Sequence, residues 1–176
     1  MRAVFTALAL WAAGLGAAAQ FGKMSVIYQQ IEAQYSDQSS LEIGILLSII
    51  GGVGLVFGTT AGLLVVRLGP KTVILAALAL GAAVSLFQSN LPSFGWLLAS
   101  RLPEGVSHLA IVVVGPTAIA ATARPRFQGL VMTLWGSFFG LTFTVLALFG
   151  PNFVNNHGIG ALFQAHAVWL LICMAA

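Results

Sequence analysis

The feature that most constrains this chain is a series of long apolar stretches, each bounded by charged residues, proline or polar clusters. A helix needs about 20 apolar residues to cross roughly 30 Å of hydrocarbon. A sixth such stretch, near 161–176, ends with the sequence and has no polar or basic exit. We therefore expect an all-α membrane protein, a polytopic bundle of six transmembrane helices with a truncated sixth helix. The other five stretches cover about 3–22, 41–66, 72–87, 94–123 and 128–149.

The composition excludes other classes of protein. Only 6% of the 176 residues are charged and the mean hydropathy is +1.00, whereas soluble domains carry about 25% charged residues. The same balance excludes a disordered chain, and a single cysteine, Cys173, excludes a disulfide scaffold. The seven basic residues are scattered rather than clustered, which argues against nucleic acid as a partner. We expect the lipid bilayer to be the surrounding medium.

The placement of the basic residues predicts an orientation. If the first stretch is retained and starts in the cytoplasm, most bases lie on the cytoplasmic side, as the positive-inside rule requires. Lys23 is then the only base in an outer loop, and 28–40 forms an outer loop or short interfacial helix. We expect a bacterial inner (plasma) membrane protein with its amino terminus in the cytoplasm. The alternative is a cleavable secretory signal, because a base, an apolar run and small residues open the chain. The predicted cytoplasmic bases are Arg2, Arg67, Lys71, Arg124 and Arg126.

The short connection between the second and third stretches carries a motif. Gly69 permits a tight reversal of the chain, and Pro70 is suited to the first position of a helix. The segment resembles the loop signature of the major facilitator superfamily, with Val66 where an aspartate is usual and Pro70 where a base is usual. In that family the loop helps to latch the two halves of the transporter on the cytoplasmic side. The matching residues of this gating motif are Gly62, Arg67, Gly69 and Lys71.

A second match lies in the fourth stretch. Arg101 followed four residues later by Gly105 resembles the helix-four pattern of the same superfamily, and 112–120 and 129–136 resemble its cyanate-permease branch. The resemblance covers nearly the whole chain. It implies half of a twelve-helix fold, the amino-terminal half, whose partner is a missing carboxy-terminal half. The implied function is secondary active transport of a small solute by alternating access. The alternative is a non-transporting six-span assembly or sensor subunit.

Three ionisable residues predict a pathway for substrate or protons. Arg101, Glu104 and His108 follow one another at spacings of three and four, so they share one helical face. An ionisable group inside a membrane span is costly unless it is paired or faces water. We expect this face to line the transport path together with Gln20 and Trp135, with an anion as the suited substrate and protons as a candidate coupling ion. The alternative is that Arg101 extends to the outer headgroups and pairs with Glu104 only to lower its cost.

Two stripes of small residues complete the sequence features. Gly54 and Gly58 in the second stretch, and Gly136 and Gly140 in the fifth, recur every fourth residue and predict helix packing. We expect no cofactor, no metal site and no enzymatic activity, because no catalytic or metal-binding spacing is present. The remaining polar groups are expected in or near an outer loop before the sixth helix. They are Asn155, Asn156, His157 and His166.

Overall fold

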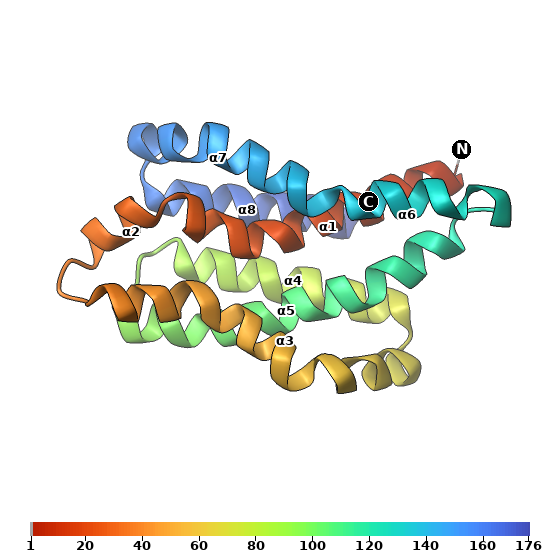
Figure 1. The fold of residues 1–176 in the computed structure, drawn as a ribbon, viewed down its shortest axis with the longest axis horizontal. Helices are drawn as coiled ribbons and strands as arrows, with labels where there is room; N and C mark the ends of the chain where they lie inside the picture. Colours follow the sequence, from red (N-terminus) through yellow and green to blue (C-terminus); the bar gives the residue numbers. More distant parts are fainter. Residues whose placement is uncertain (1) are drawn as a thin grey trace.

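The computed structural model describes residues 2–176, except for the side chains of residues 63–66. All regular secondary structure in this part of the chain is helical (Figure 1). The elements in order are α1 (Arg2–Val26), α2 (Tyr28–Gln34), α3 (Ser40–Leu68), α4 (Pro70–Gln88), α5 (Phe94–Ala121), the 3-10 helix η1 (Pro125–Phe127), α6 (Gln128–Gly136), α7 (Phe138–His157) and α8 (Ile159–Ala175).

The predicted fold class is confirmed by the length and composition of these helices. Five helical segments of the described chain are long and apolar enough to cross a membrane. A shorter apolar helix, α8, follows them. The five segments are Arg2–Val26, Ser40–Gly62, Pro70–Gln88, Phe94–Ala121 and Pro125–His157.

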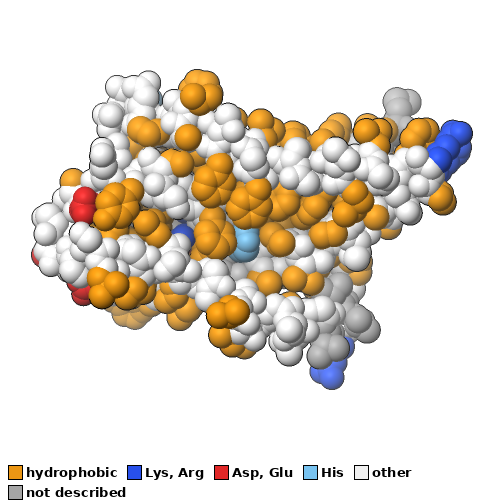
Figure 2. All heavy atoms as spheres, in the orientation of Figure 1, with side chains coloured by type: hydrophobic (Ala, Val, Ile, Leu, Met, Phe, Trp, Pro, Cys, Tyr) orange, Lys and Arg blue, Asp and Glu red, His pale blue; other side chains and the backbone are white. Residues whose placement is uncertain are grey.

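Charged residues gather at the two ends of the bundle. The amino terminus, the α3–α4 turn and the α5–α6 connection lie at one end, and the α1–α3, α4–α5 and α7–α8 connections lie at the other (Figure 1). Basic side chains mark the first end and acidic side chains the second (Figure 2). Five of the seven bases therefore share one end, and the other two, Lys23 and Arg101, are buried.

The prediction for Lys23 is wrong. We expected this residue in an outer loop, but α1 continues past it to Val26, and its side chain is 0% exposed. The apolar run resumes directly after the lysine, and Met24 and Ile27 are both fully buried. One charged residue does not end a helix whose next turn is apolar, provided that the charge finds a partner inside the bundle.

The turn geometry of the α3–α4 connection follows from two residues. Gly69 adopts a positive φ of 79°, and Pro70 occupies the first turn of α4. A residue with a side chain is strained at such a φ, so glycine suits this reversal. Val66 lies outside the residues whose side chains are described.

The fifth apolar stretch is interrupted, although we expected one helix over 128–149. The helix breaks between α6 and α7, where the Ser137 hydroxyl donates to the Leu134 carbonyl at 2.7 Å. Such a bond from a serine side chain to the preceding turn competes with regular helical hydrogen bonding. The Trp11 indole nitrogen also donates to this hydroxyl, at 3.1 Å, and ties the break to α1.

The glycines that allow close helix contacts are not those of the two predicted stripes. A Cβ atom added at Gly54, Gly58, Gly136 or Gly140 would meet nothing within 4 Å. The packing expected of these stripes therefore does not occur within the described part of this chain. Close contacts are made instead by Gly14, Gly16, Gly22, Gly81, Gly105, Gly115 and Gly160.

Candidate functional site

A group of buried polar side chains lies inside the bundle. Each member is at most 8% exposed. We call this group the polar cluster. It consists of Gln20 and Lys23 from α1, Ser85 and Gln88 from α4, Ser100, Arg101, Glu104 and Ser107 from α5, and His166 from α8.

The Glu104 carboxylate forms the centre of the polar cluster. One oxygen, Oε1, lies 2.5 Å from Lys23 Nζ, and the other, Oε2, lies 2.5 Å from Arg101 Nη1. The Gln88 side-chain amide also donates to Oε2 at 2.7 Å. Hydrogen bonds between charged partners are short and strong, and a buried carboxylate is tolerable only when it is paired in this way. The single Glu104 carboxylate therefore forms ion pairs with two buried cations.

The Arg101 guanidinium connects three helices. Its Nε donates to the Leu46 carbonyl of α3 at 3.1 Å, and its Nη1 donates to the Gln20 carbonyl of α1 at 2.9 Å. The side chain is 0% exposed, so the alternative of a side chain that extends to the headgroups is wrong. Its Nη2 has no hydrogen-bond partner among the described residues. The guanidinium thus keeps one donor group free inside the bundle.

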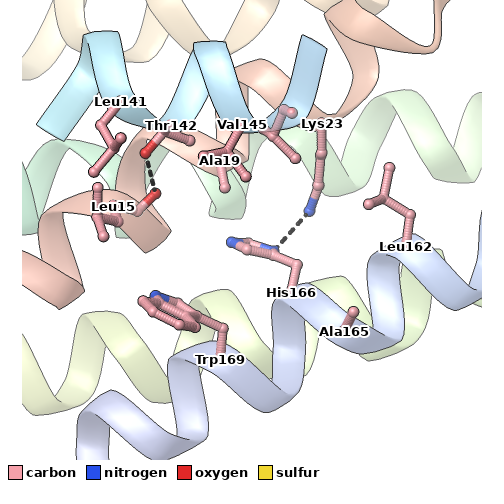
Figure 3. A pocket seen from close by; sticks show the side chains of 11 residues that line it. Leu15, Ala19, Lys23, Leu141, Thr142, Val145, Leu162, Ala165, His166 and Trp169 are labelled. Carbon is pink, nitrogen blue, oxygen red and sulfur yellow. Dashed lines mark hydrogen bonds between the residues drawn. The ribbon is translucent and has the colours of Figure 1, made fainter. Parts of the chain in front are cut away.

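Lys23, which we expected in an outer loop, and His166, which we expected in or near one, are both members of the cluster. Lys23 Nζ lies 3.1 Å from both Ser85 Oγ and His166 Nδ1, and 4.9 Å from the centre of the Phe163 ring. His166 Nε2 lies 3.0 Å from the Gly16 carbonyl oxygen. Figure 3 shows the lysine of α1 and the histidine of α8 pointing toward each other across one side of a cavity. For Lys23 and for His166, the feature of the sequence that could have indicated burial is an ionisable side chain within an apolar run.

The structure brings most of the other predicted pathway residues to the cluster or next to it. The Gln20 side-chain amide donates to Ser107 Oγ at 2.8 Å, which places it in the cluster. His108 lies one turn beyond Glu104, where its Nδ1 is 2.8 Å from the Ala17 carbonyl oxygen and its ring meets Phe21 edge-on at 4.9 Å.

Trp135 is not brought to the polar cluster. It is 6% exposed and packs in an apolar layer, where its ring contacts Phe138 at a centroid distance of 4.8 Å. Added Cβ atoms at Gly14 and Gly115 would both meet the Trp135 ring first. The indole therefore fills the space that these two glycines leave between α1 and α5.

The remaining predicted residues lie at the ends of the helices. Gly62, Arg67 and Lys71 of the loop motif are exposed near the α3–α4 turn, with Gly69 half-buried between them. Asn155, Asn156 and His157 form the exposed last turn of α7. Among the described residues, no group of three or more His, Cys, Asp or Glu side chains is placed to hold a metal ion.

Comparison with known proteins identifies the class. Residues 3–176 match the Major Facilitator Superfamily, so the chain belongs to this family of membrane transporters and is not an enzyme. It is also 29% identical over 133 residues to the inner membrane transport protein YajR of Escherichia coli (strain K12). The aligned stretch covers 76% of this chain but only 28% of YajR. The aligned stretch therefore spans less than a third of the length of that relative.

Proposed function

We propose that the chain is the amino-terminal half of a secondary transporter that moves a small solute by alternating access. The observation that supports this most directly is the polar cluster, which holds three ionisable side chains, Lys23, Arg101 and Glu104, at 0% exposure inside an apolar bundle. Such groups are costly in a membrane and usually mark a substrate or ion pathway. The half-buried surface around His108, next to the cluster, would line the route between this half and a carboxy-terminal half.

The charge of the polar cluster favours an anionic substrate. Lys23 and Arg101 contribute two positive charges against the single carboxylate of Glu104. Arg101 Nη2 is buried without a hydrogen-bond partner among the described residues, so it would offer an unused donor to an anion that reached it during the transport cycle. The resemblance of 112–120 and 129–136 to cyanate permeases is in keeping with a small anion.

The orientation follows from the charged ends. We place the end that carries Arg2, Arg67, Lys71, Arg124 and Arg126 in the cytoplasm of a bacterial cell, by the positive-inside rule. The loop motif would then lie on the cytoplasmic side, where it would help the two halves to close.

Membrane-impermeant thiol labelling tests this orientation. Single cysteines at Ser36 and Arg126 in a Cys173→Ala background should be labelled from opposite sides of the membrane, with Ser36 reacting in intact cells. Labelling of both from the same side would contradict the orientation.

Reconstitution in liposomes tests the transporter assignment. A full-length protein that contains this half should show saturable, gradient-driven uptake of a small anion, and the 176-residue chain alone should show none. Uptake by the isolated chain would disprove the half-transporter assignment. A full-length protein that moves no solute across a broad panel of anions and neutral solutes would argue for the non-transporting alternative.

A further inference from the structure

The hydrogen bonds around His166 define its tautomer. Because a carbonyl oxygen can only accept, the 3.0 Å contact with Gly16 requires a proton on Nε2. The opposite nitrogen, Nδ1, is then free to accept, and it lies 3.1 Å from Lys23 Nζ and 2.9 Å from Ser85 Oγ. The three protons of the Lys23 ammonium thus have three acceptors: Glu104 Oε1, Ser85 Oγ and His166 Nδ1.

The same atoms can hold a second arrangement without moving. If the proton between Lys23 and His166 passes to Nδ1, the N–H bond on Nζ breaks and one forms on Nδ1. The lysine then keeps a lone pair, and the total charge is unchanged. The new Nδ1–H can donate to that lone pair or to Ser85 Oγ, whose own hydrogen is donated to the Phe163 carbonyl at 2.9 Å. Both arrangements therefore satisfy the same hydrogen-bond partners.

The charges of the cluster determine which group can release a proton. Arg101 stays protonated in proteins. Protonation of Glu104 would leave two buried cations without an anion, which is strongly unfavourable. Loss of a proton from the Lys23–His166 pair instead leaves Arg101 and Glu104 as a balanced ion pair. Of the other elements in contact, α3 offers the Leu46 carbonyl, α4 offers the uncharged Ser85 and Gln88, and His108 of α5 faces Ala17.

A cavity lies beside this pair. It has a volume of about 420 Å³ and lies between α1, α7 and α8 (Figure 3). Lys23 and His166 both line it, and its other walls are apolar except for Thr142. The cavity surface is almost wholly apolar and Lys23 is 0% exposed, so the two nitrogens are closed off from the cavity in this conformation.

We propose that Lys23 and His166 hold one exchangeable proton, which they release when movement of α1, α7 or α8 opens the adjacent cavity to the two nitrogens. The proton leaves to a water molecule, which becomes a hydronium ion, and the net charge of the cluster falls from +1 to 0. This inference rests on the proposed transport function and assigns its coupling ion. Glu104 and His108 were expected on the pathway for substrate or protons; the geometry points to the Lys23–His166 pair as the proton carrier instead.

Nitrogen NMR of the chain in lipid nanodiscs tests the pair directly. With ¹⁵N-labelled histidine, three ring systems are observed, and His166 is the one lost in His166→Gln. We expect the Nε2–H tautomer for this ring, and a neutral ring at neutral pH as long as Lys23 is charged. In Lys23→Met the neighbouring ammonium is gone, so the His166 ring should become doubly protonated at a higher pH than in the wild type. His157→Asn, at the exposed end of α7, is the matched control and should change nothing at His166.

Two results would overturn the proposal: an Nδ1–H tautomer in the wild type, or identical titration of His166 in the wild type and Lys23→Met. Should Lys23→Met not fold, proton release on a jump to alkaline pH provides a second test. Lys23→Arg keeps the charge but cannot give up the proton, so it should release one proton fewer than the wild type. Equal release would also refute the pair. These measurements need no substrate, so their failure is distinguishable from a failure of the transport assay.

Discussion

Two buried layers of the same bundle are held together by opposite means. Both involve α1 and α5. The polar cluster joins these helices through charge, with Glu104 between Lys23 and Arg101. The second layer, which we call the tryptophan layer, consists of Gly14, Gly115, Trp135 and Phe138, and joins them through shape.

The two layers should tolerate different substitutions. In the polar cluster, loss of the one carboxylate leaves buried cations without a partner, whereas removal of oppositely charged residues together can be nearly neutral. In the tryptophan layer charge is irrelevant and volume decides, because protein interiors are close-packed. The polar cluster should therefore be sensitive to the balance of its charges, and the tryptophan layer to single methyl groups.

The largest effect is expected from Glu104→Leu. This change leaves Arg101 buried, charged and without a carboxylate, and we expect a loss of about 3–5 kcal/mol in the free energy of unfolding. Cys173, the only cysteine of the chain, is 9% exposed. Its reaction with a thiol-specific dye during heating in detergent reports unfolding, and the midpoint should fall sharply.

Arg101→Met is the matched control for this prediction. It removes one of the two cations and leaves Lys23 and Glu104 as a balanced pair, so it should cost about 1–2 kcal/mol, from lost hydrogen bonds. Combining it with Glu104→Leu should recover much of the lost stability, because Lys23 can then become neutral whereas Arg101 could not. Equal losses for the two single variants would show that volume, not charge balance, governs the polar cluster.

The second prediction breaks the tryptophan layer. In Gly115→Ala the added Cβ would overlap the Trp135 ring, which is itself confined by Gly14 and Phe138. Overpacking of this kind costs about 1–3 kcal/mol, and the same thiol assay would measure it. Adding Trp135→Leu makes room for the methyl group and should restore part of the loss. If Gly115→Ala is as stable as the wild type, α5 shifts more freely at this level than the contacts indicate.

The sequence was sufficient to predict the class of fold and part of the site. Long apolar runs dictate membrane helices, and the spacing of Arg101 and Glu104 already placed both on one face. Lys23 and His166 could not be predicted in the cluster, because their burial depends on Glu104 and Ser85, which are 81 positions away from them in sequence. Likewise, glycine spacing shows that a helix has a smooth face, but only tertiary structure shows whether another helix meets it. Gly115, outside the predicted stripes, makes the tight contact, and Gly58 makes none.

The smallest effect in the isolated chain is expected from Gly58→Ala. A Cβ at this position would meet nothing within 4 Å, and alanine is favoured over glycine in a helix by about 1 kcal/mol. Stability measured by Cys173 reactivity should therefore be unchanged or slightly raised. Gly105→Ala is the contrasting change, because its Cβ would lie 2.7 Å from the Val53 side chain and 3.2 Å from the Ile50 carbonyl oxygen. In a full-length protein, loss of transport by Gly58→Ala at normal abundance would indicate that this stripe contacts the second half. Destabilisation of the isolated chain would instead mean that α3 packs against another part of this half, contrary to the open face in the structure.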